Sequence, residues 1–349
     1  MSNLTNLQCP LPQLDFDVIT LGHGGGGLLT NKLLDKAIFE LFDNEKLKTR
    51  HDGAILSFGH KVAFSTDSFV ISPVFFPGGN IGELAVNGTV NDVAMCGASP
   101  RYISLALIIE EGLPVTELWD ILVHVKGAAE KAGVLIVTGD TKVVERGKGD
   151  KIFINTTGVG EMNPNAQIGT DYIKPGDKII VSGNVATHGM AIMSVRKGLE
   201  FETSIESDTC NLNHTIGHLL NEFGSQIHLM RDPTRGGVAS TLNEIARDTQ
   251  LGIDIVQDDI PIDSRVDSAC EMLGLDPLYV ANEGVFISFV DASVADAYLK
   301  KLQSLEYGEN AAIIGEVVAD HHNKVVLTSK IGGKRVVNMQ VGEQLPRIC

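Results

Sequence analysis

The chain has 349 residues, of which 43% are hydrophobic, and its formal net charge is −16. A surface this negative repels a polyphosphate backbone, which argues against nucleic acid as a partner. No apolar run approaches the length of a membrane span, no basic and apolar leader opens the chain, and the five cysteines show no paired spacing. We therefore expect a protein of a reducing compartment, the cytoplasm, with no disulfide framework and no place in the membrane.

The first half of the chain alternates between helix and strand patterns, and at this length two domains are expected. Residues 1–17 show little periodicity and predict an irregular arm. Apolar residues recur at helical spacing over 28–42, 81–95 and 115–131. Strand patterns cover 18–21, 54–58, 62–65, 102–109, 134–138 and 152–159, of which the second and third form a predicted hairpin.

A polar stretch at 161–177, rich in Asn, Pro and Gly, marks the best domain boundary. Beyond it, helical patterns cover 186–197, 209–222, 237–250 and 292–304. Strand patterns cover 178–181, 227–231, 252–256, 284–290, 311–318 and 324–328. Alternating strands and helices in both halves predict a pair of α/β or α+β domains.

Three aspartates follow apolar strand patterns: Asp67, Asp140 and Asp232. Ligands bind at the carboxyl ends of strands in sheets that helices cover. Asp92 lies inside an apolar helical pattern, where a carboxylate is costly unless it is paired or binds a metal. Because Mg²⁺ takes one or two carboxylates plus substrate phosphates, the four together favour a site for magnesium and a triphosphate. The alternative is that such aspartates cap turns and helices.

A glycine run at 22–27 precedes the first helical pattern. The bare amides of Gly24, Gly25 and Gly26 could wrap phosphates at the start of a helix. The lysine and hydroxyl of a P-loop are missing, and Asp43 does not end a second strand as a dinucleotide-binding unit requires. A flexible phosphate lid and a plain mobile loop both stay open.

Other polar residues adjoin these motifs, and each has two interpretations. Arg235 either contacts phosphate or is an exposed residue at the start of a helix. Lys142 and Glu283 either move protons beside a metal–nucleotide site or form ordinary surface salt bridges. His23 and His188 are candidate ligands, although lone histidines usually are not.

The sequence ends at Cys349, in the segment Q-L-P-R-I-C. A terminal thiol moves through a wide radius, a cation such as Arg347 favours its nucleophilic thiolate, and Pro346 stiffens the approach. This pattern predicts a carrier arm on which a small group is loaded, changed and handed on. The alternatives are a chance cysteine in a disordered terminus and lipidation, although prenylation requires the cysteine at the position of Pro346.

Seven motifs occur together and in order: S-T-D-S at 65–68, F-F-P-G-G-N at 75–80, N-D-V-A at 91–94, G-D-T-K-V-V at 139–144, D-P-T-R-G-G at 232–237, N-E-G at 282–284 and P-R-I-C at 346–349. With these motifs the chain beyond the arm resembles the HypE family, the carbamoyl dehydratases of NiFe-hydrogenase maturation. The terminal motif is the specific part. The aspartate motifs are shared with the wider superfamily of aminoimidazole-ribotide synthetase and selenide–water dikinase.

The resemblance implies a PurM-like α/β (α+β) architecture of two domains. The predicted parts are an arm at 1–17, an ATP-binding domain at 18–165, a C-terminal domain at 166–335 and a mobile tail at 336–349. The sheet of the first domain would form the core of a homodimer, and ATP would lie between domains.

The resemblance also implies an activity. Cys349 would receive a carbamoyl group from a HypF-type carbamoyltransferase, and ATP would drive dehydration of the resulting thiocarboxamide to a thiocyanate. The cyanide would then pass to iron on a HypC–HypD-type scaffold. Two alternatives stay open: an ATP-dependent enzyme of the same superfamily that acts on a small molecule, and a non-catalytic nucleotide-binding scaffold for maturation.

The residues that match the motifs take roles by the same resemblance. The ligands of Mg²⁺ would be Asp67, Asp92 and Asp232. The nucleotide would be bound by Gly24, Gly25, Gly26, Asp140, Thr141 and Arg235. Lys142 and Glu283 would assist deprotonation near Cys349. Many family members carry a serine in the glycine run and D-H-G where this chain has T-H-G at 187–189, so the roles of that loop's hydroxyl and of His188 stay open.

Overall fold

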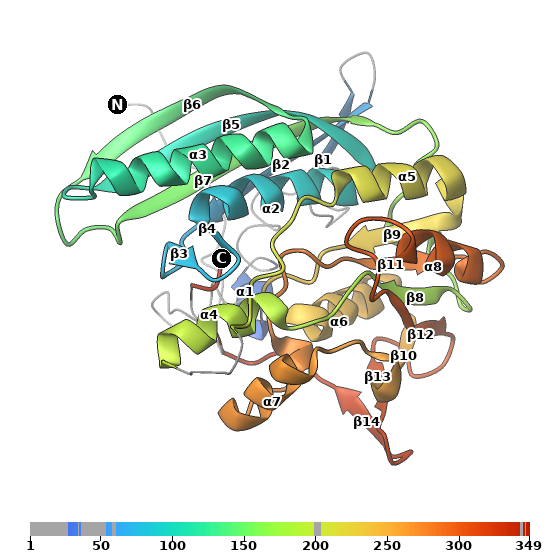
Figure 1. Ribbon diagram of the computed structural model, residues 1–349. Coiled ribbons are helices and arrows are strands. Elements are labelled where there is room, and N and C mark those ends of the chain that lie inside the picture. The colour runs from blue at the N-terminus through green and yellow to red at the C-terminus, as the bar shows by residue number, and fades with distance from the viewer. Residues whose placement is uncertain are drawn as a thin grey trace, which may run out of the picture.

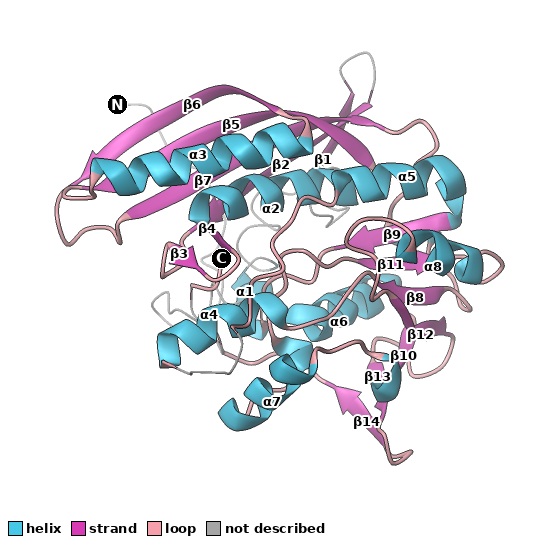
Figure 2. Ribbon diagram, viewed as in Figure 1, coloured by secondary structure: helices cyan, strands magenta, loops and turns pink. Residues whose placement is uncertain are grey.

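The computed structural model describes residues 27–33, 35, 54–57, 61–198, 204–342, 345 and 347–349. Figure 2 shows that helices and strands alternate and gather into two sheets with helices packed against them. The predicted α/β class is therefore confirmed. The predicted arm, the strand at 18–21, His23 and the glycines Gly24, Gly25 and Gly26 lie outside the described residues.

The first sheet has five strands. Their order is β1 (Ala54–Ser57), β2 (Lys61–Phe69), β7 (Ile152–Met162), β5 (Ala98–Glu110) and β6 (Leu135–Val144). All neighbours pair antiparallel except β5 and β6, which are parallel and joined by a helix. The predicted hairpin of β1 and β2 is confirmed, and β6 extends six residues beyond the predicted end at 138.

Two helices, α2 (Ile81–Met95) and α3 (Val115–Ala132), cover one face of this sheet (Figure 1). The short strands β3 (Phe75–Phe76) and β4 (Gly79–Asn80) lead into α2, and the Asn80 side chain caps it by accepting from the amides of the first turn. Gly133 ends α3 with a left-handed φ of 72°, as predicted for a helix stop. Helix α1 (Leu28–Leu33) occupies the start of a longer predicted helix.

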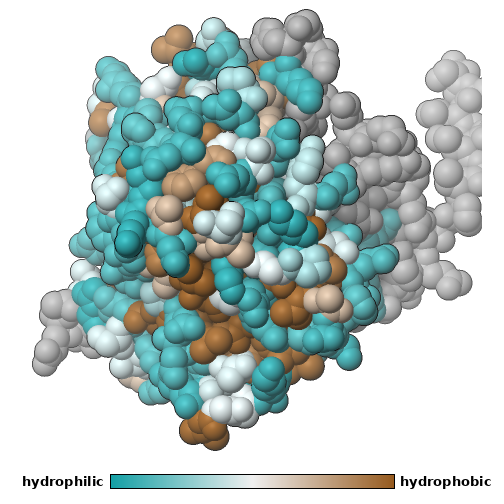
Figure 3. Space-filling model, turned by 90° about the vertical axis from the view of Figure 1, so that its right-hand side faces the viewer, coloured by the Kyte–Doolittle hydropathy of each residue, from teal (hydrophilic) through white to brown (hydrophobic). Residues whose placement is uncertain are grey.

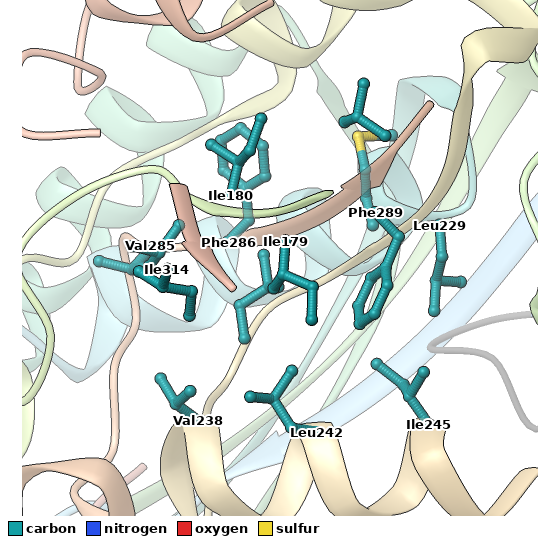
Figure 4. Packing of buried hydrophobic residues seen from close by; sticks show 14 of the residues in the cluster. Ile179, Ile180, Leu229, Val238, Leu242, Ile245, Val285, Phe286, Phe289 and Ile314 are labelled. Atoms are coloured by element: carbon teal, nitrogen blue, oxygen red, sulfur yellow. The ribbon is translucent and has the colours of Figure 1, made fainter. Parts of the chain in front are cut away.

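The second sheet has seven strands. Their order is β14 (Lys334–Val337), β13 (Val325–Thr328), β10 (Gly252–Val256), β12 (Ala312–Val318), β8 (Lys178–Val181), β11 (Ile287–Val290) and β9 (Ile227–Arg231). Figure 4 shows side chains of β8, β9 and β11 pointing toward helix α6 (Gly237–Thr249), which supplies Val238, Leu242 and Ile245. This packing is the core of the second domain.

The other helices of the second half are α4 (Thr187–Lys197), α5 (Asn213–Phe223), α7 (Ser264–Leu273) and α8 (Ala295–Gln303). Helices α5 and α8 meet through the rings of Phe223 and Tyr298, whose centroids are 5.2 Å apart. The predicted helix at 209–222 begins only at Asn213, because 209–212 has no regular structure and the Leu212 amide donates to Asn91 of α2. Helix α7 and strand β14 were not predicted.

The two halves share one hydrophobic cluster. Residues of α2 and α3 pack in it with residues of α4 and α7 and with the buried end of the chain, Leu345, Ile348 and Cys349. The label C in Figure 1 accordingly lies between the two sheets. The first sheet ends at Met162 and the second begins at Lys178, while the exact domain bounds stay a prediction.

Within the described ranges, no helix is both apolar enough and long enough to cross a bilayer. The cysteines in those ranges, Cys96, Cys210, Cys270 and Cys349, are all buried and carry free thiols.

A matched pair of glycine variants tests the packing of α2 on α3. A Cβ at Gly82 would lie 2.5 Å from the Ile121 carbonyl oxygen, whereas a Cβ at Gly127 would meet nothing within 4 Å. We expect Gly82→Ala to lower the free energy of unfolding by about 1–3 kcal/mol and Gly127→Ala to raise it by about 0.5–1 kcal/mol. Urea titrations measure both, and equal effects would contradict the packing.

Candidate functional site

The end of the chain is bound to the residue that follows strand β2. The Val70 amide donates to an oxygen of the terminal carboxylate of Cys349 at 3.0 Å. Arg347 donates to the Val70 carbonyl through Nε at 3.0 Å and Nη2 at 2.8 Å. Arg347 also forms an ion pair with Asp150. Both backbone groups of Val70 are thus satisfied by the tail, which places Cys349 beside the first sheet.

Helix α4 holds the tail from the other side. His188 is fully buried, and its Nε2 lies 2.7 Å from the Ile348 carbonyl oxygen while its Nδ1 lies 2.7 Å from Ser207 Oγ. A carbonyl only accepts, so Nε2 carries the hydrogen and Nδ1 accepts from the hydroxyl. Arg196, just over two turns further on, donates to the carbonyls of Ser72 and Arg347. Burial lowers the pKa of His188 to about 4, which keeps the ring neutral.

The Cys349 thiol lies among charged groups from both domains. Burial raises the pKa of the thiol, the positive charge of Arg235 opposes this shift, and Glu283 and Asp67 add to it. In turn, the electrostatic interactions with Cys349, and next with Asp67 and Glu283, raise the pKa of the Arg235 guanidinium. Arg347, expected to favour the thiolate, is instead engaged with Asp150 and the Val70 carbonyl. The cation beside the sulfur is Arg235.

Glu283 lies in the segment before β11, and its position is fixed by its neighbour in sequence. Asn282 Nδ2 donates to the Pro233 carbonyl at 2.8 Å, and Asn282 Oδ1 accepts from the Ala186 amide at 2.7 Å. This pins the segment to the loop after β9 and to the start of α4. Burial, followed by the charges of nearby carboxylates, raises the pKa of Glu283 well above its usual value. Such a carboxylate is a stronger proton acceptor than an ordinary glutamate.

Asp67 and Asp92 both lie between the first sheet and helix α2, on the face of the sheet that α2 covers. Ser65 Oγ donates to Asp92 Oδ2 at 2.8 Å, and Asp67, two positions along β2 from Ser65, shares the face toward α2. Burial raises the pKa of Asp67, while Arg235 and the Ser68 amide lower it. Asp67 is the seventh of nine residues in β2, so it lies near the end of the strand and not after it.

Asp232 follows β9 directly, at the strand end where the sequence placed it, and is 6% exposed. The loop beyond it carries Arg235 and reaches α6 through two glycines with φ of 75° and 61°. A Cβ at the second, Gly237, would lie 2.6 Å from the carbonyl oxygens of Leu278 and Val280, so only glycine lets the loop lie this close.

Within one chain, Asp140 and Lys142 do not lie with the charged residues that surround the Cys349 thiol. The prediction that Asp140 follows its strand is wrong, because pairing of β5 with β6 continues from Tyr102–Leu135 to Glu110–Val144. Register and the alternation of side chains put Asp140 and Lys142 on the face of the sheet opposite Asp67. There the Lys142 ammonium pairs with both Asp140 oxygens at 2.6 and 2.5 Å, and Thr141 is the strand residue between them.

The donor set suits a hard cation, although the protein alone does not complete a site. Asp67, Asp92 and Asp232 offer carboxylate oxygens, the ligand type that Mg²⁺ prefers. Among the described residues, no three His, Cys, Asp or Glu side chains come together closely enough to hold a metal ion. This fits Mg²⁺, which usually takes one or two carboxylates and completes its shell with water and substrate phosphates.

Several residues of the site were missed in the sequence. Asn91 of α2 donates to the carbonyls of Cys210 and Glu283 at 2.9 and 3.3 Å, and Asp208 accepts from the Glu283 amide at 3.2 Å. The sequence did contain a signal for Asn91, because it is a polar residue inside an apolar helical pattern. Asp208 gave none, because it stands in an irregular polar stretch and its role depends on contacts 75 positions away.

Comparison with known proteins agrees with the fold. The model of the N-terminal domain of AIR synthase related proteins matches residues 50–162, and the model of their C-terminal domain matches residues 174–328. The chain is thus a member of the AIR synthase-related class, whose fold is the predicted PurM-like architecture.

Relatives that match nearly the whole chain identify the family within this class. "Carbamoyl dehydratase HypE" of Rhizobium leguminosarum bv. viciae is 47% identical over 332 residues, which is 95% of each chain. A solved HypE–HypF complex contains a chain with a TM-score of 0.84 and 45% identity, covering 88% of this chain and 99% of that one. A HypE structure in complex with ATP has a TM-score of 0.80 and 45% identity, covering 95% and 100%. The chain belongs to the HypE family of carbamoyl dehydratases.

The depressed pKa of His188 predicts a loss of stability in acid. The ring's folded pKa is about 4 against 6.5 in the reference state. The neutral ring therefore stabilises the fold fully above pH 6.5, and this contribution is lost as the pH falls toward 4. We expect wild type to lose about 3 kcal/mol more than His188→Gln between pH 7 and 4. Denaturant titrations at both pH values measure the difference, and parallel curves would contradict the assigned burial.

Proposed function

We propose that this chain matures NiFe hydrogenase by ATP-dependent dehydration of a carbamoyl group carried on Cys349. The observation that carries the proposal is the position of the Cys349 thiol, bound at the junction of the two domains beside Arg235 and Glu283. Family membership supports the same reaction, because relatives covering nearly the whole chain are named carbamoyl dehydratases.

The reaction needs a better leaving group than an amide oxygen provides. In the proposed route the thiocarboxamide oxygen attacks the γ-phosphorus of ATP, and ADP leaves. The C–O bond then breaks with its electron pair going to phosphate. The nitrogen loses two protons, one to the departing phosphate and one to a base, and forms the nitrile of a thiocyanate. Phosphoryl transfer of this kind depends on positioning and on neutralising charge, which charged side chains around the sulfur can provide.

Each site residue receives a role from its position. Asp67, Asp92 and Asp232 would hold Mg²⁺ together with the phosphates, and the ion would neutralise charge on the transferred phosphoryl group. Arg235 would contact the phosphate that forms next to Cys349. Glu283 would remove protons from the carbamoyl nitrogen. Residues proposed to bind the nucleotide are Gly24, Gly25, Gly26, Asp140 and Thr141.

The bound position of the tail suits a cysteine that is already loaded. Burial raises the pKa of the Cys349 thiol, so the sulfur in this position is not a strong nucleophile. A carbamoylated sulfur has no proton to lose and is not disfavoured there. Loading by a HypF-type carbamoyltransferase would therefore take place with the tail released, and a solved complex of a relative with HypF supports this partner. A HypC–HypD-type scaffold would accept the cyanide in the cytoplasm.

We further propose a homodimer built on the open face of the first sheet. Helices α2 and α3 cover the other face, and among the described residues the open face exposes Phe64, Tyr102, Ile108 and Leu135 by 40 to 64%. Asp140 and Lys142 lie on this same face. A second subunit placed there would bring these two residues to a neighbouring nucleotide, where Lys142 would assist the deprotonation.

Exposed apolar residues alone do not identify this interface. Figure 3 shows hydrophobic residues gathered also on the lower part of the face that lies at the right of Figure 1, over the second domain. The proposal rests instead on a sheet with helices on one face only and on charged site residues that have no part in the site of their own chain.

Mass spectrometry of the C-terminal peptide tests the proposed reaction. With ATP, Mg²⁺, carbamoyl donor and the loading partner, wild type should gain one carbamoyl group on Cys349 and then lose one water. Asp92→Asn should load normally and lose water roughly tenfold more slowly or worse, because a metal ligand is missing. Cys349→Ser should gain nothing. Water loss at the wild-type rate in Asp92→Asn would contradict the metal assignment.

Sedimentation of variants that introduce a negative charge at the surface tests the dimer. Leu135→Glu places a charge in the proposed interface and should shift the protein to monomer and abolish water loss, since Lys142 would no longer reach a second site. Ile331→Glu is the control, because Ile331 is 95% exposed at the turn between β13 and β14. A dimeric Leu135→Glu protein would rule out this face.

A further inference from the structure

A second acidic residue, Asp208, lies directly behind Glu283. Asp208 Oδ1 accepts from the Glu283 amide at 3.2 Å, and the Gly284 amide also binds the carboxylate. The backbones are in close contact, since a Cβ on Gly284 would lie 1.8 Å from the Asp208 carbonyl oxygen. The backbone thus fixes the Asp208 carboxylate against the amide of Glu283, and the charge of Asp208 adds to the raised pKa of the Glu283 carboxyl.

Both carboxyl groups have a buried oxygen without a hydrogen-bond partner among the described residues, Glu283 Oε1 and Asp208 Oδ2. An unpaired buried carboxylate oxygen is costly, whereas a protonated one can donate. Burial raises the pKa of Asp208 to about 6, and the backbone amides oppose the shift. Asp208 is therefore able to exchange a proton near neutral pH, and the raised pKa of Glu283 makes its carboxylate a stronger proton acceptor than an ordinary glutamate.

Asp208 also lines a pocket of about 350 Å³, whose lining does not include Cys349. The pocket lies between α2 and the second domain, and its rim includes the exposed residues Glu309 and Asn310, so it reaches solvent. The charged groups around it, besides Asp208, are Glu83, Lys131 and Glu309, and Cys210 lies in its wall. None of these residues has a role in the reaction proposed above.

The reaction needs such a path, because it releases two protons from one nitrogen. The thiocarboxamide nitrogen loses one proton when its oxygen becomes bonded to phosphorus, and the second when the C–O bond breaks and the nitrile forms. Glu283 is buried and holds one proton at a time. It must release the proton that it takes up before it can act again, because the departing phosphate carries away only one of the two.

We infer that Asp208 relays protons from Glu283 to water in this pocket, so that the Glu283 carboxylate is restored in each dehydration. The inference rests on the proposed function. Asp208 acts through Glu283 and does not touch the carbamoyl group, which makes it a positioning residue. Each transfer moves a proton from one carboxyl oxygen to another and finally to water, and it requires no other reactant.

Single-turnover dehydration of carbamoyl-loaded protein, followed by the mass of the Cys349 peptide, tests the relay. Asp208→Asn keeps an acceptor for the Glu283 amide but cannot pass on a proton. We expect loading at the wild-type rate, water loss slowed roughly tenfold or more, and a larger solvent deuterium isotope effect than in wild type. Glu309→Gln lines the same pocket and should match wild type.

Rescue by formate separates a relay from a structural role. Asp208→Ala leaves room for this small acid in the pocket, and added formate should restore water loss in Asp208→Ala but not in Asp208→Asn. Water loss at the wild-type rate in Asp208→Asn, an equal slowing of loading, or a folded Asp208→Ala protein that formate does not accelerate would each overturn the relay. Should Asp208→Ala not fold, Asp208→Asn decides. A failure of the proposed function is distinct, because wild type would then lose no water.

Discussion

The site depends on the backbone of Val70, whose amide and carbonyl are both occupied by the end of the chain. Val70 follows the last residue of β2, so its position is fixed by the first sheet. The other side of the tail is held by His188 and Arg196 of α4, which belongs to the second half. The sulfur therefore lies where the two domains meet, and a change in the position of one domain relative to the other would move it.

A second constraint is the imbalance of charge around that sulfur. Burial raises the pKa values of Asp67, Asp208 and Glu283, and nearby carboxylates raise that of Glu283 further. The positive charge of Arg235 lowers the pKa values of Asp67 and Glu283. Such a group of carboxyls is costly in the absence of ligands. The same group is suited to a nucleotide that arrives with divalent cations, and to chemistry that removes protons from nitrogen. The acidity of the chain as a whole, with a net charge of −16, is consistent with phosphates that bind only together with cations.

The fold was largely predictable from the sequence, because long periodic segments such as 81–95 and 178–181 carry their own signal. Elements with weak periodicity, among them α7 and β14, were missed. Asp67, Asp92, Asp232 and Glu283 stand out by their place after or within apolar runs. The opposite orientation of Asp140 and Lys142 could not be foreseen, because it depends on how far β6 continues and on its register with β5.

The roles of Asp208 and His188 depend on contacts between distant parts of the chain. Asp208 binds the amide of Glu283, and His188 binds the carbonyl of Ile348, 160 positions further on. No local pattern encodes such pairs. For Cys349 the reverse is true: the sequence indicated a reactive thiol, but it named Arg347 as the neighbouring cation, and only the folded chain brings Arg235 to the sulfur.

The most direct test of the account is infrared spectroscopy of protein loaded with a carbamoyl group labelled with carbon-13. On addition of ATP and Mg²⁺, a nitrile stretching band shifted by the isotope should appear in wild type and stay attached to the Cys349 peptide after digestion. Consumption of ATP without a nitrile band on Cys349, or the same band in Cys349→Ser, would contradict the claim that this sulfur carries the group that is dehydrated.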